Sequence, residues 1–76
     1  MYFIFDKESN RVFGGMSGSG QYIFENFSAL DDCVRCVIFS SEVDACATRK
    51  GLIFAGFEKV SVHPISEFEK IVKGGN

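Results

Sequence analysis

The sequence lacks the marks of an exported or membrane-bound protein. No apolar run approaches the ~20 residues that span a bilayer, and no basic segment precedes an apolar one near Met1, so we expect no signal peptide. The three cysteines are an odd number. Without an export signal, they indicate reduced thiols, and the sequence predicts a cytoplasmic protein.

Basic charge is also scarce. The chain has 8 Lys and Arg against 10 Asp and Glu, a net charge of −2. A general nucleic-acid binder needs a basic face, so we expect no direct nucleic-acid contact. Acidic residues gather between 25 and 44, where Arg35 is the only basic residue. This segment is either an ordinary solvated face or a patch that faces a basic, nucleic-acid-handling partner.

The sequence has no complete set of catalytic residues. His63 is the only histidine. A general base needs a nucleophile and an orienting partner, and no Ser, Cys or Asp stands at a suggestive distance from it. The adjacent acids Asp31 and Asp32 are typical of a solvated loop. We therefore predict that the protein is not an enzyme.

The cysteines raise the alternative of a metal site. Cys33, Cys36, Cys46 and His63 together would make a Cys₃His zinc set. If 33–39 is a strand, however, Cys33 and Cys36 point to opposite faces. Cys46 fits the apolar stripe of a helix, and a free Cys behaves there as a small hydrophobe. We predict reduced, metal-free thiols and no cofactor.

The chain of 76 residues is predicted to be one domain, 1–76, near the lower size limit for independent folding. Its apolar fraction of 46% supplies one core. For a domain this small, burial and conformational entropy nearly cancel. A dimer or a tight partner would therefore stabilise it.

The patterns predict an α/β fold of the α+β type. We expect a small mixed β-sheet with an N-terminal hairpin, a β-α-β unit and a C-terminal helix, with both helices on one face. Aromatic and β-branched runs predict the strands, at 1–6, 11–13, 21–24, 33–39 and 60–63. Capping signals predict helices at 41–50 and 66–73. The strands on either side of the first helix would be parallel if they share a sheet.

The first helix has signals at both ends. Ser41 and Asp44 form a start signal, and Gly51 supplies a left-handed stop. A narrow apolar stripe of small residues is expected to face the sheet, and it is formed by Val43, Cys46 and Ala47. For the second helix, Ser66 and Glu69 form a capping box. Residues 52–57 are predicted to form either a loop that packs on the core or a short extra strand.

Two segments are ambiguous. Residues 33–39 favour a strand, but Ser28 and Asp31 could instead cap a short helix over 28–37. Residues 14–20 hold four glycines. They have the glycine spacing of a phosphate-binding loop, yet Gln21 and Tyr22 stand where the Lys and Ser/Thr should follow. A flexible loop or a broad turn is the favoured interpretation, and such a loop is a plausible contact surface.

Aromatic residues on the first strand suggest an interface. Tyr2 and Ile4 point to one face, and Phe3 and Phe5 to the other. If both helices cover one face, the other would show aromatic rings to water, and such patches mark interfaces. We therefore predict a partner-binding surface made of Tyr2, Met16, Ser17, Ser19, Tyr22, Glu25, Asp31 and Asp32.

In style, the chain resembles the short proteins that phages and mobile elements make against host machinery, such as anti-CRISPR proteins. The resemblance rests on size, a lone domain, mild acidity and the missing catalytic set, and covers no specific residues. It implies a small non-catalytic protein-binding protein that inhibits a larger protein or nucleoprotein complex in the host cytoplasm. The alternative is a homodimeric accessory or structural protein. A zinc-binding protein or a small enzyme is less favoured.

Overall fold

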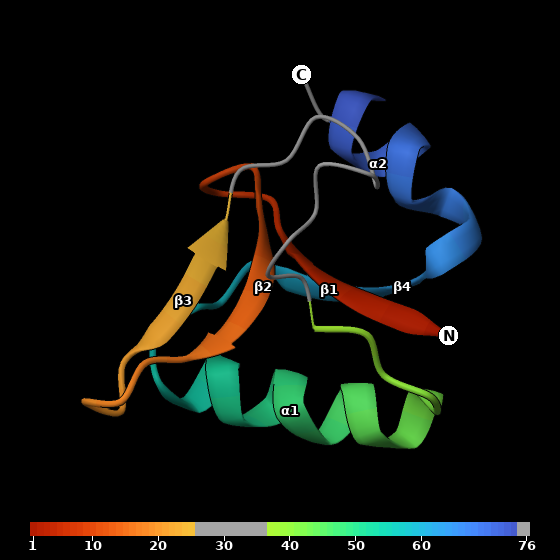
Figure 1. Ribbon diagram of the computed structural model, residues 1–76. Coiled ribbons are helices and arrows are strands. Elements are labelled where there is room, and N and C mark those ends of the chain that lie inside the picture. Colours follow the sequence, from red (N-terminus) through yellow and green to blue (C-terminus); the bar gives the residue numbers. More distant parts are fainter. Residues whose placement is uncertain (26–36, 75–76) are drawn as a thin grey trace.

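The computed structural model describes residues 1–25 and 37–74, with side chains as far as Ile71. The elements are β1 (Tyr2–Asp6), β2 (Arg11–Met16), β3 (Tyr22–Glu25), α1 (Glu42–Phe54), β4 (Val60–Pro64), the 3₁₀ turn η2 (Ile65–Glu67) and α2 (Phe68–Gly74). Within the described residues, the four strands form one sheet in the order β3-β2-β1-β4 (Figure 1). The predicted class, helices on a small sheet that begins with a hairpin, is confirmed.

Strand pairing departs from the predicted mixed sheet. Each strand pair that the structure describes is antiparallel, because β1 separates β4 from the segment before α1. Residues 33–36 of the strand predicted at 33–39 lie outside the described residues. The alternative helix over 28–37 also lies outside them, except for Val37. Phe39 forms an isolated antiparallel bridge with Tyr2. The segment 37–39 and β4 therefore run in the same direction on either side of β1, without pairing.

The two helices lie on opposite faces of the sheet, so the prediction of one shared face is wrong (Figure 1). Side-chain alternation along β1 is the reason, because it places apolar residues on both faces. One core cluster lies under α2 and consists of Phe3, Phe5, Val12 and Phe68. The other lies over α1 and consists of Ile4, Phe13, Leu52 and Val60. On β1, the aromatic residues Phe3 and Phe5 are therefore covered and do not form the exposed face predicted from the sequence.

The N-terminal hairpin is held by a buried acid. Asp6 is 6% exposed. One carboxylate oxygen accepts a hydrogen bond from the Glu8 amide at 3.1 Å, and the other accepts one from the Ser9 hydroxyl at 2.8 Å. Asn10 takes the left-handed conformation with φ 60°, which Asn tolerates better than most residues. The polar turn thus satisfies the acid that the fold buries.

Helix α1 begins where the sequence predicts and ends later. The Ser41 hydroxyl accepts from the Asp44 amide at 3.2 Å, which is the expected cap. The stop at Gly51 is wrong, because the helix continues to Phe54 and buries Leu52 completely. The turn comes at Gly56, with φ 111°. The Gly56 amide donates to Ile53 O and the Phe57 amide to Leu52 O, both at 3.0 Å, which is the Schellman arrangement.

The face of α1 that contacts the sheet is also different from the prediction. Ala45 and Leu52 are the buried residues of α1. The small-residue stripe of Val43, Cys46 and Ala47 is exposed, and Val43 keeps 78% of its surface accessible. The large side chain of Leu52, one residue past the predicted stop, decides which face turns inward. Arg49 fixes this rotation, since its Nε donates to Val60 O at 3.0 Å.

The segment 14–20 forms the end of β2 and a hydrogen-bonded turn. Gly14 and Gly15 lie at a bulge in the β2–β3 pairing. The Ser17 amide donates to Gln21 O at 2.7 Å, and the Gly20 amide to Ser17 O at 3.0 Å. The broad turn is therefore the correct alternative, and β3, a strand, follows it.

The chain after β4 does not use the predicted capping box. Ser66 lies inside η2, which begins after Pro64 and has no side-chain cap. The fixed φ of proline favours such a turn. Helix α2 starts at Phe68, and burial of this ring, 1% exposed, holds α2 on the sheet.

Candidate functional site

The structure brings together only part of the predicted partner-binding set. Met16, Ser17, Ser19 and Tyr22 gather at the β2–β3 turn, where the two serine hydroxyls lie 2.9 Å apart. Tyr2 is separated from them by the segment 37–39, since Phe39 pairs with Tyr2 and the Val37 amide donates to Phe13 O.

The acidic members of the set are placed differently. Glu25 pairs with Val12, at the opposite end of β3 from the turn. Asp31 and Asp32 lie outside the described residues. The structure therefore places Met16, Ser17, Ser19 and Tyr22 at one end of the β2–β3 pair, and the surface at Tyr22 is hollowed.

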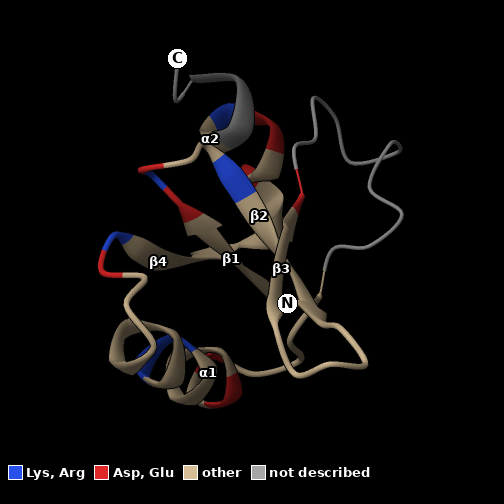
Figure 2. Ribbon diagram, turned by 90° about the vertical axis from the view of Figure 1, so that its left-hand side faces the viewer, with Lys and Arg blue, Asp and Glu red and all other residues tan. Residues whose placement is uncertain are grey.

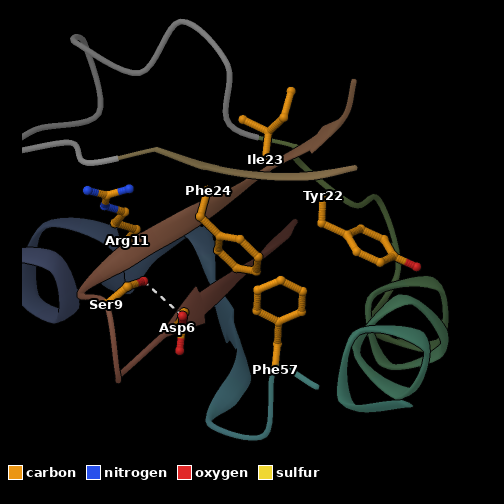
Figure 3. A pocket seen from close by; sticks show the side chains of 7 residues that line it. All are labelled: Asp6, Ser9, Arg11, Tyr22, Ile23, Phe24 and Phe57. Atoms are coloured by element: carbon orange, nitrogen blue, oxygen red, sulfur yellow. Dashed lines mark hydrogen bonds between the residues drawn. The ribbon is translucent and has the colours of Figure 1, made fainter. Parts of the chain in front are cut away.

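Tyr22 lines an open hollow of about 420 Å³ on this side of the sheet. The lining residues come from β1, the β1–β2 turn, β2, β3 and the chain after α1, and are Asp6, Ser9, Arg11, Tyr22, Ile23, Phe24 and Phe57. Figure 3 shows the rings of Tyr22, Phe24 and Phe57 on one side of β3, with Ile23 pointing the other way. We call this site the aromatic hollow.

The rings of the aromatic hollow pack on one another and on the core. The ring centroids of Phe24 and Phe57 lie 4.9 Å apart, and Tyr22 meets Phe57 edge-on at 5.9 Å. Phe13, beneath them, lies 5.7 Å from Phe24. These separations are those of favourable aromatic pairs. All three lining rings remain half-buried, so they form a packed apolar floor that still faces solvent.

The polar groups of the aromatic hollow have different roles. The Asp6 carboxylate is occupied by Glu8 and Ser9, so it serves the turn. Arg11 is exposed, and its guanidinium makes no hydrogen bond or ion pair with any side chain in the described ranges. It is therefore available to an external carboxylate, which guanidinium groups bind in bidentate fashion.

Sequence reasoning selected Tyr22 and missed its neighbours. Phe24 stands two residues after Tyr22 on a strand, and this spacing already places both rings on one face. Phe57 and Arg11 come from other elements, so local pattern gives no signal for them. The Gly56-Phe57 pair could have been recognised as the end of a helix, because a glycine followed by an apolar residue is typical of a Schellman turn.

A Ser–His pair is a second constellation that the sequence reasoning did not find. Ser61 Oγ lies 2.7 Å from His63 Nε2, because alternate residues of β4 share a face. Burial lowers the pKa of His63, and this effect outweighs the negative charge of Glu67, which raises it. The ring also lies 5.7 Å from Phe3. Within the described residues, no side chain hydrogen-bonds to His63 Nδ1, so the pair lacks the orienting group of a catalytic triad.

The structure describes one of the three cysteines. Cys33 and Cys36 lie outside the described residues. Cys46 is a free thiol, exposed on α1. Among the residues that the structure describes, no three His, Cys, Asp or Glu side chains cluster as a metal site would require. The metal-free state of the thiols stays a prediction.

Neither helix in the described part of the chain is long and apolar enough to cross a membrane. Comparison of the chain with family models, with curated proteins and with solved structures gave no match.

Proposed function

We propose that the protein is a small non-catalytic protein-binding protein whose aromatic hollow receives a side chain of a larger partner. One observation carries this proposal. Three half-buried rings pack into an apolar floor, and the same hollow is lined by Arg11, whose guanidinium has no partner among the described side chains. Tyr and Arg are enriched at interface hot spots, where a few desolvated residues supply most of the binding energy.

The geometry favours a partner segment with two features. The floor of Phe24 and Phe57 suits an apolar or aromatic side chain, because ring pairs gain beyond their buried area. The Arg11 guanidinium suits a carboxylate next to that side chain. We therefore expect the bound segment to carry an acidic residue beside an apolar one.

In cellular terms, we propose a cytoplasmic inhibitor that blocks a larger protein or nucleoprotein complex, as anti-CRISPR proteins do. Small size, acidity and the lack of an oriented catalytic set among the described residues support this proposal. The net charge of −2 favours basic partner surfaces. Glu25, at the end of β3, would influence mainly the association rate, because charges at an interface rim steer encounter.

The test is affinity capture with matched bait variants. The baits are wild type, Arg11→Ala, Tyr22→Leu and Lys70→Ala. Lys70 is an exposed cation on α2 and does not line the aromatic hollow, so its removal takes away the same charge as loss of Arg11 without changing the hollow. Captured proteins are identified by mass spectrometry, produced separately and titrated against each variant by calorimetry. Urea unfolding of each variant confirms that it is folded.

We expect Arg11→Ala and Tyr22→Leu to weaken binding by about tenfold or more, and Lys70→Ala by less than about twofold. If all three variants bind the captured protein like wild type while folded, the aromatic hollow is not the binding site. Addition of the wild-type protein should also lower the activity of the captured complex, and Arg11→Ala should do so less.

A further inference from the structure

The outer surface of α1 is mostly apolar and is exposed in the described part of the protein. Its side chains recur at helical spacing and comprise Val43, Cys46, Ala47, Lys50 and Phe54, which we call the outer face of α1. With 3.6 residues per turn, these positions lie on the side opposite the buried Ala45 and Leu52. Phe54 is 95% exposed and Val43 is 78% exposed. The residues that the structure describes leave both side chains open to solvent.

Charge is distributed along α1 in a self-complementary way. Glu42 and Asp44 lie in the first turn, and the cations Arg49 and Lys50 follow in the second half. Figure 2 shows both red and blue segments on α1. Arg49 is engaged with Val60 O, but Lys50 is exposed. Glu42 and Lys50 each lie four residues from Cys46, on opposite sides of it. When two such helices cross antiparallel near Cys46, the Glu42 of each copy meets the Lys50 of the other.

The centre of the outer face permits close approach. Cys46 and Ala47 are small, and nothing lies within 4 Å of a Cβ added at Gly51. Glu42, Val43, Cys46, Ala47 and Lys50 line a shallow hollow of about 320 Å³ there. Small residues at a crossing bring helix axes to the short end of the usual 8–10 Å separation. The bulky Val43 and Phe54 then flank the crossing.

We propose that the outer face of α1 is the contact of a homodimer, in which two copies pack α1 against α1 in antiparallel orientation. The opposite charges of Glu42 and Lys50 select a second copy and this orientation, because a parallel pair would set like charges against each other. One helix of 13 residues per copy makes an interface at the small end of the known range, so the dimer is expected to be weak and concentration-dependent. The proposal uses a different surface from the aromatic hollow, and the two stand or fall separately.

Sedimentation equilibrium tests the proposal, with protein between about 10 µM and about 1 mM. The mass should rise from the monomer value of 8.4 kDa towards twice that value. Phe54→Ser should weaken the dimer by about tenfold or more. Met16→Ser is the matched control, because Met16 is also an exposed apolar residue, 58% exposed, on β2. It should leave the dissociation constant unchanged.

Charge reversal tests the orientation. Glu42→Lys and Lys50→Glu should each weaken the dimer, and the double variant should restore much of the loss, because the pair is re-formed with its signs exchanged. Circular dichroism confirms that each variant keeps α1.

Three results would overturn the proposal. The first is a wild type that stays monomeric at the highest concentration. The second is an equal effect of Phe54→Ser and Met16→Ser. The third is a double variant no better than the worse single one. A further outcome is possible if the wild type is monomeric. If Phe54→Ser then fails to bind the captured protein and Arg11→Ala still binds it, the outer face of α1 binds another protein. That outcome contradicts both the homodimer and the aromatic hollow.

Discussion

Phe54 and Phe57 stand three residues apart and have opposite environments. Phe54 belongs to the outer face of α1 and is 95% exposed. Phe57 lies past the turn at Gly56. Its ring packs edge-on against Tyr22, and its centroid lies 4.9 Å from that of Phe24. One ring therefore contributes to folding and the other does not. The rings of the aromatic hollow pack on the core and are proposed to bind a partner, whereas the outer face of α1 is exposed in the described part of the chain.

This difference decides how each surface can be tested. A substitution in the aromatic hollow alters core packing as well as any contact with a partner. A substitution on the outer face of α1 changes only what α1 meets in solution. Stability measurements on matched residues should separate the two surfaces before any partner is known.

The largest expected contrast is between Phe57→Ala and Phe54→Ala. Loss of the Phe57 ring removes two aromatic contacts and part of the floor under β3, so we expect about 2–3 kcal/mol of destabilisation. Phe54→Ala should change the free energy of unfolding by less than about 0.5 kcal/mol. Urea unfolding at low protein concentration measures both. Similar losses for the two variants would remove the basis of the comparison.

The two glycines near the end of α1 give the next contrast. Gly56 has φ 111°, so Gly56→Ala forces a side chain into a strained conformation and should cost about 1–2 kcal/mol. Gly51 lies inside the helix with open space around its Cα. Gly51→Ala should therefore stabilise the protein by up to about 1 kcal/mol. Thermal unfolding at one fixed concentration reports both, and a loss of stability in Gly51→Ala would show that the helix does not continue through this position.

The smallest effect concerns pH and a residue outside both surfaces. Burial lowers the pKa of His63 below its ordinary value of 6.5. The unfolded chain therefore takes up a proton first as pH falls, and stability decreases from about pH 6.5 downwards until the folded chain is also protonated. His63→Gln should flatten this part of the stability profile. Each melting temperature is expressed as a shift from its value at about pH 7.5. Equal shifts for wild type and His63→Gln as the pH falls would contradict the burial of the ring.

The sequence predicted local features better than their environment. The Ser41 cap is short-range chemistry between residues three apart, so it could be read directly. The end of α1 could not, because a glycine stops a helix only when the next residues gain nothing by continuing. Here Leu52 gains complete burial. That burial also turned the stripe of Val43 outwards, against the predicted rotation.

The same limit applies to the candidate site. Tyr22 was identified from its strand and its amphipathic ring. Arg11 and Phe57 join it only through the pairing of β2 with β3 and the turn at Gly56, which are long-range outcomes of folding. The prediction that both helices share one face failed for a related reason. Each face of β1 carries buried apolar residues, so each needs a helix of its own.

The central claim is that the aromatic hollow binds a protein partner. Hydrogen exchange of the chain, alone and saturated with the captured and purified partner, tests it most directly. We expect slower exchange at the amides of β3, Tyr22–Glu25, and of the Lys7–Arg11 turn, with no change at the start of α1, Glu42–Cys46. Slower exchange confined to α1, with β3 and the turn unchanged, would contradict it.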